Sequence, residues 1–195
     1  MSELVKYLTR LADGLIAGAP KFEELDSVAG DGDLGITAGK IAEGIRSGIT
    51  SASGDLKSDL MLIGREISKS APSTFGTLFA TGFVRAASVV INNDDPKLNL
   101  ERALTAAYDG IASRGKAQLG ERTLLDALAP AIEALKNSTD LKSGLKNAAI
   151  AARVGATATA NMAPKHGRAG WIGDRAKGLE DAGANVVAAS FEAIC

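Results

Sequence analysis

Residues 4–16 read LVKYLTRLADGLI and set the pattern for the whole chain. Apolar residues recur there every three or four positions, the spacing of one face of an α-helix: Leu4, Leu8, Leu11, Leu15 and Ile16. The same spacing continues through most of the sequence, and sustained strand alternation is missing. We therefore expect an all-α fold, with about eight helices packed around a shared core.

The spacing predicts seven further helices, which cover residues 36–49, 60–67, 75–91, 98–113, 122–135 (starting at Arg122 or Thr123), 141–162 and 186–194. The segment 141–162 is rich in alanine and is a strong helix former. Its small faces could pack inside the fold or against a second subunit, so a homodimer stays open. We expect most of the 22 glycines to lie between helices.

Length and composition indicate an ordinary soluble domain spanning residues 1–195, with 46% hydrophobic and 23% charged residues. The net charge of −1 gives no reason to expect nucleic acid or an anionic membrane as a partner. No apolar run approaches the length of a membrane span. The single cysteine, Cys195, excludes an intrachain disulfide, and no secretory signal is evident, so we expect a cytoplasmic protein.

Residues 25–37, LDSVAGDGDLGIT, carry three carboxylates, Asp26, Asp31 and Asp33, within eight positions. Carboxylates this close repel one another unless a cation neutralises them, and hard oxygen ligands suit magnesium bound to substrate phosphates. Taken alone, the Asp-Gly pairs also fit a solvated turn. An EF-hand is a poor fit, because Gly35 and Ala42 occupy positions that need oxygen ligands, and no P-loop motif is present.

Three further loops carry chemistry. Residues 70–77, SAPSTFGT, offer hydroxyls before a helix, where they could help to bind phosphate or could simply be N-caps at Ser73 or Thr74. Residues 114–126 hold three cations and two glycines, which could serve a nucleotide or form a solvated turn in which Asp126 pairs with Arg122. Residues 165–184 contain the only Trp and the only His; we interpret His166 as a polar surface residue, with a catalytic role as the alternative.

The order of these motifs resembles the nucleotide-binding L subunit of dihydroxyacetone kinases over nearly the whole chain. The resemblance is carried by Asp26-x4-Asp31-x-Asp33-x-Gly35, Phe75-Gly76-Thr77, Gly115-Lys116-Ala117, Arg122-Thr123-Leu124-Leu125-Asp126, Gly167-Arg168-Ala169 and Asp181-Ala182-Gly183-Ala184. Each motif is weak alone, but four loops in the family's order and spacing are specific.

The resemblance implies an antiparallel eight-helix barrel that binds ADP or ATP at one end. By that match, Asp26, Asp31 and Asp33 would hold two Mg²⁺ ions that bridge the phosphates, and Arg168 would act at the phosphate, so these four residues would carry catalysis. The remaining nucleotide contacts would come from Leu34, Gly35, Ile36, Thr37, Ser70, Ala71, Gly115, Leu124, Asp181, Ala182 and Gly183. Metal ions and an arginine supply the positioning and charge neutralisation that phosphoryl transfer requires.

The resemblance also implies partners. A separate K subunit would hold a short ketose, and in one branch of the family a phosphocarrier M subunit recharges bound ADP, whereas in another branch ATP is consumed. This sequence departs from the family at Leu34, where His or Thr is common, and at Pro72, which has no N–H to donate. These departures favour a divergent kinase subunit or, alternatively, a catalytically inactive nucleotide-sensing module. Related domains that phosphorylate carrier-bound fatty acids are a third, weaker interpretation, since those chains generally carry extra domains.

Overall fold

A computed structural model describes residues 2–166 and 178–195 of the protein. Within these ranges the chain forms eight α-helices and one short 3₁₀ helix, with no strand. The helices are α1 (Glu3–Ala29), α2 (Leu34–Thr50), α3 (Leu56–Ser70), α4 (Thr74–Ala87), α5 (Pro96–Gly115), α6 (Leu125–Lys136), α7 (Leu141–Ala158) and α9 (Ala182–Ile194), with η1 (Thr159–Asn161) after α7.

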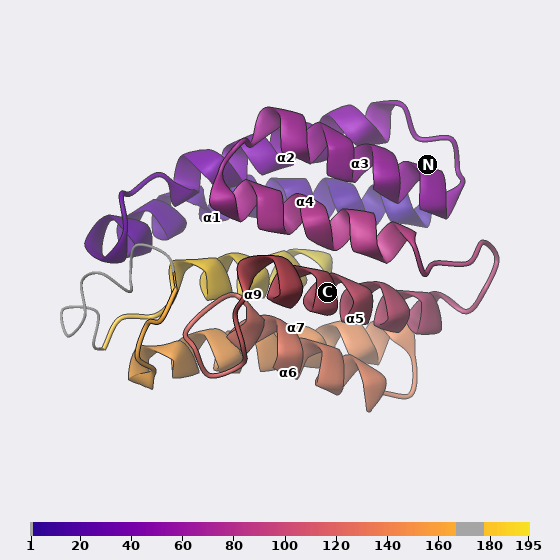
Figure 1. Ribbon diagram of the computed structural model, residues 1–195. Coiled ribbons are helices and arrows are strands. Elements are labelled where there is room, and N and C mark those ends of the chain that lie inside the picture. The colour runs from indigo at the N-terminus through magenta and orange to yellow at the C-terminus, as the bar shows by residue number, and fades with distance from the viewer. Residues whose placement is uncertain (1, 167–177) are drawn as a thin grey trace.

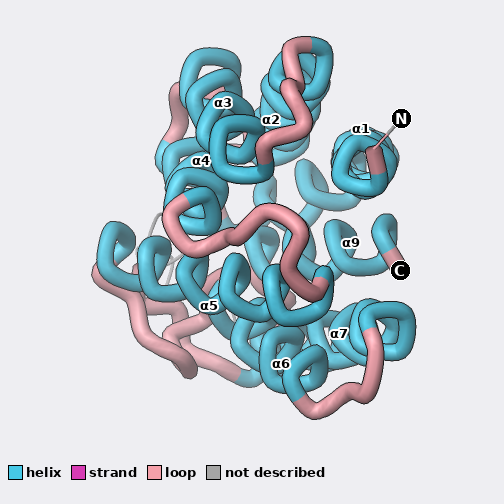
Figure 2. Tube along the Cα trace, turned by 90° about the vertical axis from the view of Figure 1, so that its right-hand side faces the viewer, coloured by secondary structure: helices cyan, strands magenta, loops and turns pink. Residues whose placement is uncertain are grey.

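The helices form a closed ring. Each helix packs against the next along the chain, and α9 packs against α1 (Figures 1 and 2). Because the chain runs alternately up and down, every second connection lies at the same end of the ring. Residues 30–33, 71–73, 116–124 and the described parts of 159–181 therefore connect helices at one end, on the left in Figure 1. The expected antiparallel eight-helix barrel is confirmed.

The buried faces follow the sequence pattern only in part, and α1 and α2 give two examples of exceptions. Leu8, Leu11 and Leu15 of α1 are buried, as expected, but Ile16 of the same helix is 44% exposed. Ile36 in the first turn of α2 is 60% exposed. Spacing alone places Ile16 on the apolar face of its helix, but spacing does not distinguish the edge of an apolar stripe from its centre.

The alanine-rich α7 packs inside the barrel. Its buried residues are Gly144, Leu145, Ala148, Ala149, Ala152, Gly155 and Ala156. Small side chains let α7 approach α6 closely: a Cβ atom on Gly155 would overlap the backbone of Asp126. Of the two alternatives for the alanine faces, packing within the fold is therefore correct.

Glycine is common inside the helices as well as between them, contrary to expectation. Gly44 and Gly48 of α2 face α3, and a Cβ atom on Gly44 would lie 2.6 Å from the Cα of Ile67. These glycines allow neighbouring helices of the ring to pack backbone against backbone. Sequence reasoning counted glycine as a loop signal and missed this use.

Several helix boundaries differ from the predicted ones, and at α9 a capping residue is the reason. Asp181 caps α9, so the helix begins at Ala182, four residues before the expected Val186. α4 ends at Ala87, and the apolar residues up to Ile91 lie beyond it. α6 begins at Leu125, and α7 ends at Ala158 in a 3₁₀ turn, short of Met162. α1 extends to Ala29, with Pro20 inside it, so Asp26 lies in a helix rather than in a loop.

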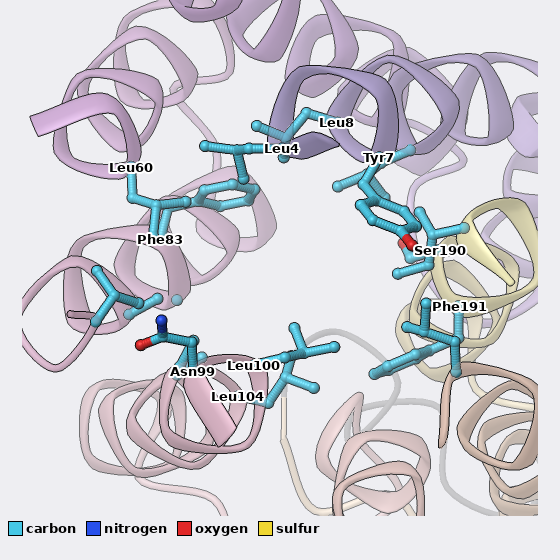
Figure 3. A pocket seen from close by; sticks show the side chains of 18 of the residues that line it. Leu4, Tyr7, Leu8, Leu60, Phe83, Asn99, Leu100, Leu104, Ser190 and Phe191 are labelled. Carbon is cyan, nitrogen blue, oxygen red and sulfur yellow. The ribbon is translucent and has the colours of Figure 1, made fainter. Parts of the chain in front are cut away.

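The interior of the ring holds an apolar cavity of about 440 Å³. Leucine and phenylalanine side chains from opposite helices point into it (Figure 3). Glu3, Asp94 and Pro96, which also line it, lie at the helix starts opposite the four connections. The cavity also reaches Leu124 at the start of α6, so it extends toward the end of the barrel where the sequence places its chemistry.

Candidate functional site

The three carboxylates singled out by sequence converge. One oxygen from each of Asp26, Asp31 and Asp33 lies within 4.8 Å of the others. Asp26, in the last turn of α1, is partly buried, whereas Asp31 and Asp33 are exposed. The cluster is thus open to solvent and accessible to a ligand.

Asp26 is held in place by the start of the next helix. Its Oδ2 atom accepts hydrogen bonds from the backbone N–H groups of Asp33 (3.0 Å) and Leu34 (3.2 Å). These two bonds fold the connection back over the end of α1. Gly32 adopts φ +74°, a left-handed conformation that glycine adopts without strain, and a Cβ atom on Gly30 would overlap the Asp26 carboxylate.

This donor set fits a hard divalent cation. Three carboxylates supply only oxygen ligands, and their mutual repulsion disfavours a compact cluster unless a cation is bound. Three of the described side chains form the cluster, so a cation held by them would complete its coordination with water or with oxygens of a phosphate, which is the way Mg²⁺ is usually bound beside substrates.

The start of α2 adds a second feature that suits phosphate. Asp33 occupies the N-cap position, but its side chain makes no capping hydrogen bond among the described residues. The first turn of α2 therefore directs backbone N–H groups toward the same end as the carboxylates. The hydroxyl of Thr37 lies 3.5 Å from that of Ser73, which links this turn to the α3–α4 connection.

Ser73 is the N-cap of α4 and accepts from the N–H of Gly76 at 3.0 Å, so the capping interpretation of this loop holds. Gly76 must be glycine here, because a Cβ atom would overlap the carbonyl oxygen of Ala71. Ala71 is 1% exposed, and the hydroxyl of Ser70 donates to the carbonyl of Glu66. The turn is thus compact, with small polar groups beside the acidic cluster.

The α5–α6 connection is organised by a buried carboxylate. Asp126 accepts from the backbone N–H groups of Gly120 (2.5 Å) and Thr123 (2.7 Å) and is 3% exposed. The ion pair between Asp126 and Arg122 that the sequence offers as one interpretation is not formed: neither residue takes part in an ion pair within the described part of the chain. Asp126 binds backbone N–H groups instead. Arg122 itself is 2% exposed, not solvated as a charged turn would be.

The α7–α9 connection ends at Asp181, which caps α9 by accepting from the N–H of Ala184 at 2.7 Å. Burial raises the pKa of Asp181 to about 6. The charges of Asp126 and Asp26 act in the same direction, and that of Arg122 opposes them. Charges from α1, from α6 and from the α5–α6 connection therefore all influence Asp181.

Gly183 lies where the starts of helices α4, α6 and α9 meet. Its Cβ position would lie 3.1 Å from the ring of Phe75 on α4 and 3.6 Å from the Cβ of Leu124 at the start of α6. The starts of α4, α6 and α9 thus adjoin at one corner of the barrel end. Leu124 is 7% exposed.

Outside this corner, Glu121 joins the α5–α6 and α7–α9 connections. Its Oε2 atom lies 2.6 Å from His166 Nε2, and its other carboxylate oxygen lies 3.3 Å from the Lys165 ammonium. The hydrogen bond with His166, followed by one from the backbone N–H of Gln118, lowers the pKa of Glu121 to about 2. His166 therefore hydrogen-bonds to Glu121 beside the Lys165–Glu121 ion pair, and together these contacts link two loops.

The predicted site residues fall into two groups. The acidic side has the three carboxylates and the first turn of α2, where the Leu34 side chain is buried and leaves only its backbone to the site. The other side has Gly115 at the end of α5, Leu124, Asp181, Ala182 and Gly183. Arg168 lies outside the described residues. Sequence reasoning missed the burial of Arg122, which depends on a left-handed backbone at φ 58° that no local motif signals.

Comparison with known proteins agrees with this arrangement. The model of the DAK2 domain family matches residues 28–195. The chain belongs to the DAK2 domain family. This DAK2 domain is 29% identical, over 192 residues, to the ADP-binding subunit DhaL of the PEP-dependent dihydroxyacetone kinase of Escherichia coli, covering 95% of this chain and 91% of that protein.

Longer relatives contain the domain as one part. Dihydroxyacetone kinase 1 of Saccharomyces cerevisiae is 32% identical over 189 residues, and the match covers 93% of this chain but 32% of that protein. The crystal structure of the dihydroxyacetone kinase from C. freundii in complex with AMP-PNP and Mg²⁺ matches with a TM-score of 0.79 and 25% identity, covering all of this DAK2 domain and 34% of that chain. The described helices include none that could span a membrane.

Proposed function

We propose that this DAK2 domain is the nucleotide-binding subunit of a dihydroxyacetone-type kinase. It binds ADP or ATP with Mg²⁺ at the end of the barrel where the four connections lie, and the phosphoryl group passes to a short ketose held by a separate substrate-binding subunit. The observation that carries the proposal is the convergence of three carboxylates within 4.8 Å, beside a helix start whose N-cap residue, Asp33, makes no capping hydrogen bond among the described residues. The names of the E. coli and yeast relatives support the kinase class.

Each part of the site has a role in this proposal. Asp26, fixed by two backbone N–H groups, and the exposed Asp31 and Asp33 would hold the metal, which would neutralise the phosphates and orient the transferred group. The N–H groups in the first turn of α2 would donate to phosphate oxygens. The corner formed by Leu124 and Gly183 would hold the base and sugar. Arg168 is proposed to act at the phosphate.

A second candidate, an inactive nucleotide-sensing module, is favoured by one observation. Leu34 is 6% exposed and its side chain lies in the core, so it gives no polar group to the site at a position where the kinase family commonly has one. In that case the nucleotide would bind, but no phosphoryl group would be transferred.

Titration calorimetry tests the proposal, with ADP and ATP each in Mg²⁺ or in EDTA. We expect Mg²⁺-dependent binding that is lost in Asp31→Asn. Tight retention of ADP would favour recharging by a phosphocarrier subunit, and exchangeable ATP would favour direct use of ATP. If nucleotide-free protein binds neither, the proposal is wrong. Binding without turnover, in the presence of a substrate-binding subunit of a dihydroxyacetone kinase and of dihydroxyacetone, would favour the sensing module.

A further inference from the structure

Arg122 lies in the α5–α6 connection, between the N–H groups that Asp126 binds. Its side chain turns inward and is 2% exposed. Its Nη2 atom donates to the carbonyl oxygen of Leu179 at 2.9 Å. Arg122 therefore ties the α5–α6 connection to the segment that precedes α9.

The rest of this guanidinium is not satisfied. Nε and Nη1 are buried, and neither has a hydrogen-bond partner among the described residues. Burial lowers the pKa of Arg122, although the charge of Asp181 opposes this effect. Unpaired buried donors on a cation are costly, and they are uncommon in native proteins without an explanation such as a missing ligand.

The location of Arg122 indicates where the missing acceptor lies. Leu124 follows it by two residues and adjoins Gly183, and Leu179 lies four residues before Gly183. Arg122 thus lies behind the corner that we assign to the base and sugar of the nucleotide. The acidic cluster lies elsewhere, in the last turn of α1 and the connection between α1 and α2.

We infer that Arg122 is a further nucleotide-binding residue, which holds the segment before α9 through Leu179 and donates from Nε and Nη1 to an acceptor atom on the base or ribose. This inference rests on the proposed function. A guanidinium suits the role because its donors are fixed in one plane and it keeps its charge when buried. The bound nucleoside would complete the hydrogen bonding of a group that the described residues leave short of acceptors.

The test compares Arg122→Met and Arg122→Lys with the parent chain. The measurements are ADP affinity in Mg²⁺ by calorimetry and the melting temperature without ligand. Arg102→Gln is the matched control, because Arg102 pairs with Asp94 at the opposite end of the barrel. We expect R122M to bind ADP at least about 10-fold more weakly, the usual worth of a charged hydrogen bond. Without ligand it should melt no lower than the parent, since an unpaired buried charge has been removed.

R122K keeps the charge but not the planar set of donors, so we expect a several-fold loss of ADP affinity, smaller than that of R122M. R102Q should bind ADP like the parent. ADP binding within twofold of the parent in R122M or R122K would overturn the inference, because buried water would then suffice for the free donors. A lower melting temperature of both variants, with proportionate loss of ADP binding, would reduce Arg122 to a structural role. If the parent itself fails to bind ADP, the proposed function fails first.

Discussion

Asp33→Asn should stabilise the protein without metal and remove its stabilisation by metal. Asp33 shares a 4.8 Å cluster with two other carboxylates. Even in a water-like dielectric, each such pair repels by about 0.9 kcal/mol, so D33N relieves roughly 2 kcal/mol before screening by salt. The loss of a negative charge at the start of α2 costs about 0.3–1 kcal/mol, and asparagine remains a good N-cap residue. The net gain is about 1 kcal/mol, or about 2–4 °C in melting temperature for a domain of this size.

The order of the two melting temperatures, D33N above the parent, should reverse when the ligand is present. With ADP and Mg²⁺ at about 100 times the dissociation constant, the parent gains about 2.7 kcal/mol, whereas a chain with a disabled metal site gains little. The assay is thermal unfolding in low-salt buffer with EDTA, then with Mg²⁺ and ADP. In the first condition D33N should melt above the parent, and in the second below it.

Two controls test whether this reversal of the melting temperatures comes from the carboxylate cluster. Asp109→Asn removes an exposed carboxylate of α5 outside the cluster. Its melting temperature relative to the parent should be the same in EDTA as in Mg²⁺ with ADP. Raising the salt to 1 M should shrink the advantage of D33N, because screening then acts within about 3 Å. An unchanged melting temperature of D33N in EDTA, or an equal gain of both chains with Mg²⁺ and ADP, would refute the reasoning.

Three further changes test other parts of the site. Because Asp181 binds its proton more tightly in the folded chain, the free energy of unfolding should fall as the pH rises from about 4 to 6. Asp181→Asn should lack this loss, and its free energy of unfolding in urea at pH 7 should exceed that of the parent by up to about 3 kcal/mol. Gly76→Ala should cost about 1–3 kcal/mol, because its Cβ meets the carbonyl of Ala71, whereas Gly39→Ala, with open space around it, should be neutral or stabilising. Asp126→Asn should cost about 2 kcal/mol and speed proteolysis of residues 116–124, because an amide replaces a carboxylate that accepts two backbone bonds; a variant as resistant as the parent would contradict this.

Sequence reasoning worked best where the determinants are local. The apolar spacing of Leu8, Leu11 and Leu15 predicted a buried face, and the closeness of Asp26, Asp31 and Asp33 in the chain predicted their cluster. The resemblance gave the closed ring, whose alternating direction brings distant loops to one end. Whether the predicted nucleotide contacts are made stays a prediction.

What could not be predicted depends on packing between distant segments. The inward turn of Arg122 requires Leu179, which lies 57 positions later in the chain. The helical glycines depend on neighbouring backbones, as Gly44 does on Ile67. The start of α9 at Ala182 was missed because the Asp181 cap is followed by small residues with no apolar period.

Because α1 packs against α9, the first and last helices of the chain are neighbours in the ring, and the order of the helices along the chain can be changed. Ser2 and Cys195 flank helices that begin and end on the side away from the four connections, and both chain ends face the viewer in Figure 2. A short peptide joining them would leave the ring intact, and new termini could be opened at residues 137–140 on the same side. The barrel is therefore a natural candidate for circular permutation, or for insertion into another polypeptide, with its polar end left free.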